Sequence, residues 1–274
     1  MNEFFNLKIK YLVYYTMNQF LTYMRNQGLS EKTINEHSRN LNKFKNLGGL
    51  LKWSEEKTID FIKENYANGS PQKSITSTLS KYRHYRGKST ETIRQFLSEA
   101  NADASLLQRQ KNDKLRENLP DIDFKQLLNT YYRNKQYKNF VILYLLLNYN
   151  TRNKDLVLRV VNNEDDINPN ENFLFIRDKD VVYIRNDYKT NDTYGTKRYI
   201  IKSKKFFTAV QELDSLLIDN DNLDRQVKKV TGGINQSTLF KMLVSKNNNL
   251  KSIAKASKAR GTNMDTIASS YDIT

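Results

Sequence analysis

Apolar residues recur at the three-to-four-residue spacing of amphipathic helices between residues 17 and about 103. A serine precedes most of these stretches, as expected of a helix N-cap; these serines are Ser30, Ser54, Ser70 and Ser89. Gly28 and the pair Gly48-Gly49 are placed to end two of the helices. We therefore expect a helical N-terminal domain of residues 17–103, preceded by a loosely ordered extension over residues 1–16.

The pattern changes twice in the rest of the chain. Residues 104–120 are rich in Gln, Lys, Asn and Arg, which predicts an interdomain linker, and residues 137–147 are apolar enough for a buried helix. After Asn168-Pro169 the period of the pattern changes to two residues, as in β-strands. Three runs of β-branched and aromatic residues show it, at residues 173–176, 181–184 and 198–201. Helices resume at Phe206. The prediction is a mainly α (α+β) protein, whose second domain, residues 121–274, is mostly helical with a small three-stranded antiparallel sheet.

Charge indicates the class of partner. The chain has a net charge of +15 and a pI near 9.6, which favours a polyanion, above all nucleic acid; a basic surface kept for solubility is the alternative. Cysteine is absent, and the two histidines lie in the N-terminal half, so we expect no metal site. The longest apolar run, residues 140–147, is far shorter than the ~20 residues of a membrane span. We expect double-stranded DNA as partner and no membrane.

Three motifs follow one another in the second half of the chain. Arg152-Asn153-Lys154-Asp155-Leu156 comes directly after the apolar helix, and Tyr188-Lys189-Thr190 follows the second predicted strand. Arg260-Gly261-Thr262 precedes Tyr271, and Thr262 stands nine positions before the tyrosine. In this order the motifs resemble the catalytic domain of tyrosine recombinases, the phage-integrase family, and are most similar to the divergent recombinase-like proteins of large DNA viruses.

The resemblance implies a reaction. Tyr271 would attack a DNA phosphate and hold a 3′-phosphotyrosine, without metal or nucleotide cofactor. Arg152, oriented by Asp155, would stabilise the transition state, and Lys189 would protonate the leaving oxygen from an Asn191-Asp192 hairpin turn. Lys197 and Arg198, just beyond the turn, compete with Lys189 for this role or contact DNA. Each lysine could also be an ordinary solvated charge.

Two positions depart from the family pattern. Thr262 stands where the family has His or Trp, and it offers one hydrogen bond without charge. The family's His-x-x-Arg box should fall within residues 237–245, where its arginine aligns with Phe240, or with Lys241 if the helix is shifted by one residue. If Phe240 holds that place, we expect strand cleavage to be severely impaired while the fold survives.

The N-terminal helices are similar to the domain with which these recombinases clamp DNA. Arg39 with Lys43, and Lys81 with Tyr85, are each one helical turn apart and could face phosphates together. The sequence thus predicts a DNA strand transferase. The alternatives are a recombinase-fold protein that binds DNA without cutting it, as in genome packaging, and a type IB topoisomerase. Assembly into homo-oligomers on DNA stays open.

Overall fold

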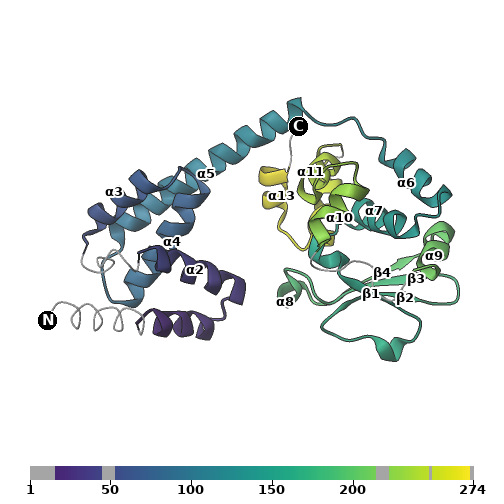
Figure 1. The fold of residues 1–274 in the computed structure, drawn as a ribbon, viewed down its shortest axis with the longest axis horizontal. Helices are drawn as coiled ribbons and strands as arrows, with labels where there is room; N and C mark the ends of the chain where they lie inside the picture. The colour runs from purple at the N-terminus through teal and green to yellow at the C-terminus, as the bar shows by residue number, and fades with distance from the viewer. Residues whose placement is uncertain (1–15, 45–52, 214–221, 247–248, 272–274) are drawn as a thin grey trace. The chain divides into compact units, whose positions relative to one another are not determined.

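The computed structural model describes residues 16–44, 53–213, 222–246 and 249–271 (Figure 1). The chain divides into two compact units, Met1–Lys111 and Asn112–Thr274, each considered by itself below. The extension expected at residues 1–16 lies outside the described residues apart from Thr16, as does the stop expected at Gly48-Gly49.

In its described residues, 16–44 and 53–111, the first unit has helices as its regular structure. Residues 16–26 form a helix, which is followed by α2 (Glu31–Phe44), α3 (Glu55–Asn65), α4 (Ser70–Tyr85) and α5 (Glu91–Glu117). Ser54 caps α3, accepting a hydrogen bond from the Lys57 amide at 3.2 Å. The apolar faces read from the sequence meet in one core, which includes Phe20, Leu41, Ile62, Leu79 and Tyr82.

Helix α5 extends through most of the predicted linker. It continues to Glu117, and the boundary between the two units, at Lys111, falls inside it. The residues that suggested a linker, chiefly Gln, Lys, Arg and Asn, include three good helix formers. An exposed helix tolerates them as well as a loop does, so their polarity reports exposure here and not the absence of a helix.

The second unit combines helices with one sheet. Its elements in chain order are α6 (Phe124–Arg133), α7 (Tyr137–Tyr149), the 3-10 turn η2 (Asn153–Leu156), β1 (Leu158–Val161), the 3-10 turn η3 (Glu164–Asp166), β2 (Asn172–Ile176), β3 (Val181–Arg185), α8 (Asn191–Tyr194), β4 (Lys197–Ile201), α9 (Lys204–Gln211), α10 (Leu223–Val230), α11 (Gln236–Lys246), α12 (Leu250–Arg260) and α13 (Met264–Tyr271). The prediction of a mainly helical α+β protein is confirmed.

The sheet has four strands in the order β1-β2-β3-β4. Strands β2, β3 and β4 form the predicted antiparallel set, whereas β1 pairs with β2 in parallel. The prediction of three strands was wrong because β1, only four residues long, directly follows a 3-10 turn and shows no clear alternation. The expected hairpin turn at Asn191-Asp192 is also corrected, since these residues begin the short helix α8.

Helix α7 lies at the centre of the second unit. Its residues 140–143, 145 and 146 are buried, and it contacts α6, α9 and α10. A smaller apolar cluster joins the last three helices through Phe240 of α11, Ile253 of α12 and Ile267 of α13, and Tyr271 packs against it. This cluster fixes the end of α13 beside the end of α12. Among the described helices, none is both long and apolar enough to cross a membrane.

Candidate active site

Arg152 joins two of the three motifs. The chain leaves α7 through Asn150, whose φ of 50° ends the helix, and Arg152 precedes η2. The Arg152 guanidinium donates from Nη1 to the Arg260 carbonyl at 2.7 Å and from Nη2 to Thr262 Oγ1 at 2.8 Å. Thr262, the departure noted in the sequence, is therefore a direct partner of Arg152 and positions its guanidinium.

Asp155 holds the Arg152 backbone and pairs with a second arginine. Its side chain is fully buried, accepts a hydrogen bond from the Arg152 amide at 2.9 Å and forms an ion pair with Arg185 of β3. Arg185 is also fully buried and donates to the Ala259 carbonyl at 2.8 Å. Asp155 thus holds the Arg152 backbone, while the Arg185 side chain links the sheet to the end of α12. Asp155 was expected to orient the Arg152 side chain. Its described hydrogen bond is with the backbone amide of Arg152 instead.

Arg260 is a site residue that the sequence reading missed. It is the last residue of α12 and only 4% exposed. Its Cζ atom lies 3.8 Å from the ring centre of Phe240 and 4.7 Å from that of Tyr271, so two aromatic rings flank the guanidinium. Its Nε and Nη1 atoms are buried and have no hydrogen-bond partner in the described part of the chain. Arg260 thus carries a buried positive charge that no carboxylate among the described residues pairs with.

Tyr271 ends α13 with its hydroxyl turned to this cluster. Arg260 Nη2 donates to the Tyr271 hydroxyl at 3.5 Å, and the Tyr271 and Phe240 rings meet edge to face at a centroid distance of 4.9 Å. The tyrosine predicted as nucleophile therefore lies beside Arg260, to which the sequence motif had assigned no role.

Gly261 makes the turn that brings Arg260 and Thr262 to the site. It caps α12 in the left-handed conformation, at φ 61°. A Cβ atom at this position would collide with Thr190 Oγ1, which donates to the Gly261 carbonyl at 2.9 Å. The close approach of the segment after β3 to this corner requires glycine.

Of the two candidate lysines, Lys197 is the one whose described contacts lie at the end of α12, close to Arg260. Lys197 Nζ donates to the Lys258 carbonyl at 2.5 Å and to the Ala259 carbonyl at 3.2 Å. Burial, followed by the charges of Arg185 and Arg152, lowers the pKa of Lys197 to about 8. Lys189 is exposed in the segment between β3 and α8. Lys197 stands opposite Arg185 in the β3-β4 ladder and so shares its face of the sheet, whereas no described contact joins Lys189 to Arg152 or Tyr271; the role expected of Lys189 stays a prediction.

Lys241 lies away from these residues. Its Nζ donates to Asn112 Oδ1 at 2.5 Å, and among the described contacts none joins it to Arg152 or Tyr271. Phe240, the other residue aligned with the family's second arginine, is buried and carries Arg260 on its ring. The charge expected from α11 is thus absent there, and a guanidinium from α12 occupies the neighbouring space.

The two residue pairs of the first unit that were predicted to contact DNA differ in exposure. Arg39 and Lys43 are exposed along α2 and could both face a phosphate backbone. Lys81 is exposed on α4, but Tyr85 packs against the rings of Phe20 and Tyr23, at 5.5 and 5.0 Å. Tyr85 therefore serves the aromatic core of the first unit.

Positive charge exceeds negative charge at the site. Arg152, Arg185, Arg260 and Lys197 come together at the end of α12, and Asp155 is the single carboxylate among the described residues that pairs with any of them. Burial also lowers the pKa of Arg260 to about 10, which leaves it charged near neutral pH. Buried cations without counter-charges are costly, so the cluster has the electrostatic character of an oxyanion site.

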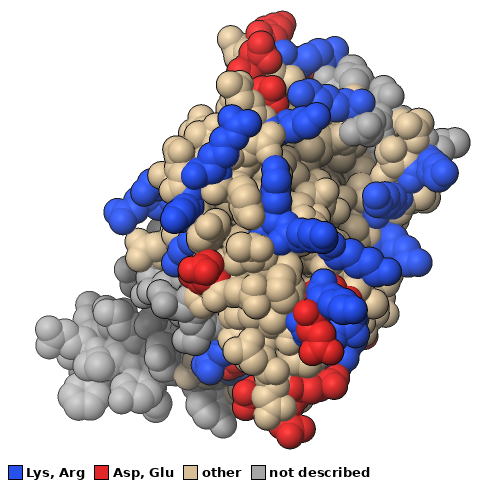
Figure 2. All heavy atoms as spheres, turned by 90° about the vertical axis from the view of Figure 1, so that its right-hand side faces the viewer, with Lys and Arg blue, Asp and Glu red and all other residues tan. Residues whose placement is uncertain are grey.

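Basic side chains are also spread over the outer surface. On the face drawn in Figure 2, Lys and Arg side chains are distributed over much of the middle, and Asp and Glu gather mainly near the upper and lower ends. A surface of this kind suits a polyanion longer than a single phosphate.

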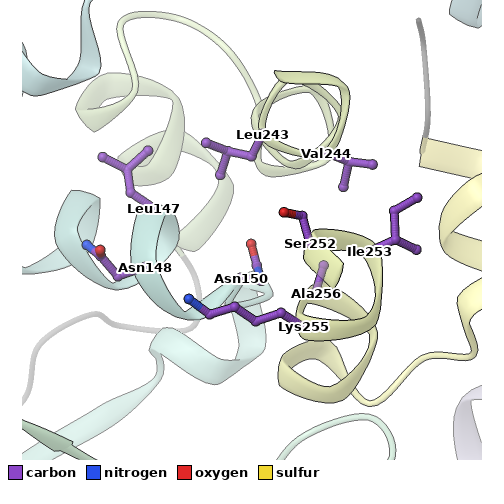
Figure 3. A pocket seen from close by; sticks show the side chains of 9 residues that line it. All are labelled: Leu147, Asn148, Asn150, Leu243, Val244, Ser252, Ile253, Lys255 and Ala256. Carbon is purple, nitrogen blue, oxygen red and sulfur yellow. The ribbon is translucent and has the colours of Figure 1, made fainter. Parts of the chain in front are cut away.

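A cavity of about 240 Å³ lies near the site but is separate from it. Its walls come from α7, α11 and α12 and include Leu147, Leu243, Val244 and Ile253 (Figure 3). None of the predicted site residues lines it. We assign it no part in the chemistry.

Comparison of the chain with family models, with curated proteins and with solved structures gives no match.

Proposed function

We propose that the protein is a DNA strand transferase of the tyrosine recombinase type, with Tyr271 as nucleophile. The observation that carries the proposal is the position of the Tyr271 hydroxyl beside the uncompensated guanidinium of Arg260, next to Arg152. A nucleophilic hydroxyl and buried cations without a carboxylate partner fit a reacting phosphodiester, whose transition state gains negative charge.

The proposed reaction uses the residues as follows. The Tyr271 oxygen bonds to the phosphorus, its proton passes to solvent, and the bond from phosphorus to the 5′ oxygen breaks. Lys197 donates a proton to that leaving oxygen. Arg152 and Arg260 bind the non-bridging oxygens, and Thr262 keeps Arg152 in place. Attack by a 5′ hydroxyl on the phosphotyrosine reverses these bond changes and joins the strands.

Double-stranded DNA is the proposed partner. The net charge of +15, the exposed Arg39 and Lys43 on α2, and the basic outer surface support it, because each neutralised phosphate releases counterions. This reading predicts binding that weakens steeply as salt is raised.

A nicked DNA substrate tests the proposal. When cleavage releases a short strand that diffuses away, the reverse reaction fails and the covalent protein–DNA adduct accumulates. The expected result, without added magnesium, is an adduct that denaturing gels resolve and that peptide mapping places on Tyr271. Salt-dependent binding with no adduct on any viral or cellular DNA terminus would instead support the binding protein without chemistry. Relaxation of supercoiled plasmid would support a topoisomerase.

A further inference from the structure

A second cavity, of about 580 Å³, borders the candidate active site and shares Lys197 with it, whereas the rest of its lining has no part in the proposed reaction. It lies between the end of α7, the α8–β4 segment and α12. Its volume is within the range of about 300–1,000 Å³ common for sites that enclose small ligands. Lys197 lines it, so the cavity begins one side chain from the residues that surround Arg152 and Arg260.

The walls of this cavity combine tyrosine rings with cations. Three tyrosines contribute, namely Tyr149, Tyr194 and Tyr199, and the charged residues are Lys197, Arg198, Lys255 and Lys258. Among the described residues that line it, none is acidic. Asn148 at the end of α7 and Lys255 of α12 line both this cavity and the smaller one drawn in Figure 3, where the Lys255 side chain extends toward the end of α7. This lining suits a ligand that carries negative charge and has a flat ring.

The tyrosines differ in exposure in a way that suits stacking. Tyr149 and Tyr199 meet at 5.0 Å between ring centres, and Tyr149 also packs on Tyr183 at 5.8 Å, so these rings form a fixed wall. Burial, followed by the nearby Tyr144 and Tyr199, raises the pKa of Tyr149 to about 12, which keeps its hydroxyl a neutral donor. Tyr194 is 50% exposed and has Lys197 Nζ 5.3 Å from its ring centre. Tyr194 can thus cover a ring that enters.

We propose that this cavity binds one unpaired nucleotide of a DNA strand, with its base against the tyrosines and its phosphate among the lysines. Aromatic faces stack on any base, and ammonium groups pair with phosphate without a fixed geometry, so recognition would tolerate different sequences. An acidic peptide would pair with the lysines but would make no use of the exposed face of the Tyr194 ring. The proposal does not depend on strand cleavage.

Binding of a single-stranded probe tests it with the full chain. The probe is a short oligothymidylate with one internal 2-aminopurine, whose fluorescence falls when the base stacks. Wild-type protein should quench the probe, and Tyr194→Ala should weaken binding by at least about fivefold, the lower end of the stacking contribution of one base. Tyr194→Phe should bind like wild type, because stacking does not need the hydroxyl.

Matched variants and a competitor decide the outcome. Ile200 is 54% exposed on the same strand as Lys197 and does not line the cavity, so Ile200→Ala should leave both quenching and affinity unchanged. Lys255→Met should lower the salt slope of binding by about 0.7. Equal binding by wild type and Tyr194→Ala, or polyglutamate competing as well as oligothymidylate of the same charge, would overturn the proposal. Formation of the Tyr271 adduct is a separate measurement, so either proposal can fail alone.

Discussion

Arg260 rests on Phe240, with 3.8 Å between the arginine Cζ atom and the centre of the aromatic ring. Phe240 is the position at which the family resemblance calls for a second arginine, and in the sequence it looked like the loss of an essential charge. In the structure the ring supports a guanidinium that arrives from α12. Under the proposed function, Phe240 is a platform for that cation, and the expected impairment of cleavage does not follow.

Replacing Arg260 should separate stability from activity. Arg260→Met keeps side-chain length and removes a buried charge whose Nε and Nη1 lack partners in the described residues, so the melting temperature should not fall. Adduct formation should fall by about 10²–10³, as for loss of one transition-state donor. Thermal unfolding and single-turnover cleavage measure the two effects. Arg225→Met, which removes an exposed charge from α10, should change neither. An active Arg260→Met protein would contradict the assigned role.

Tyr271→Phe tests the nucleophile. The change removes one hydroxyl and keeps the ring that packs on Phe240, so DNA affinity should stay within about a factor of ten, or ~1.4 kcal/mol. The covalent adduct should disappear completely. Binding is measured by fluorescence anisotropy and the adduct by denaturing electrophoresis. With 17 tyrosines in the chain, an adduct that persists in Tyr271→Phe would show that a different tyrosine attacks the phosphate.

The sequence predicted those parts of the fold that depend on local pattern. Helical spacing located the helices of the first unit, and residues 137–147 correspond to the buried α7. Ser54 caps α3 as expected, whereas Ser70 lies inside α4, which is capped by Gly69. Period-two runs located β2, β3 and β4. Strand β1 was missed because four residues carry too little alternation, and α5 was cut short because polar helix formers resemble a linker.

The site was predicted less completely because it depends on contacts between distant segments. The spacing from Thr262 to Tyr271 identified two residues that do lie near Arg152 and Arg260. Which lysine reaches the site follows from strand register, since Lys197 stands opposite Arg185, and the chain alone does not give that register. Arg260 could have been noticed as a charge directly before Gly261-Thr262, but its burial between two rings is visible only in the fold.

The buried ion pair of Asp155 with Arg185 should be critical for the stability of the second unit. Asp155→Asn leaves the Arg185 charge buried without its partner, which should cost about 3–5 kcal/mol. The free energy of unfolding of the second unit can be measured from hydrogen exchange of the β3 amides at increasing urea concentration. Asp187→Asn is the control, since Asp187 pairs with Lys154 on the surface and should cost no more than about 1 kcal/mol. An equal loss of stability in the two variants would show that the buried pair contributes no more than the surface pair.

Lys197 gives the reaction a pH dependence whose sign can be stated. Its pKa is about 8, so it is protonated and able to donate below that pH and loses the proton above it. In kcat/KM, which reports the free enzyme, the rate with an ordinary 5′-oxygen leaving group should fall above about pH 8, by about tenfold per unit. A 5′-sulfur leaving group needs no proton, so the ratio of the oxygen rate to the sulfur rate isolates the proton donation assigned to Lys197.

Lys197→Met should lower that ratio at neutral pH and make it independent of pH, whereas Lys189→Met should reproduce the wild-type profile. If Lys189→Met flattened the ratio instead, the acid would be the exposed lysine between β3 and α8, and the side chain bound to the Lys258 and Ala259 carbonyls would have only a structural role.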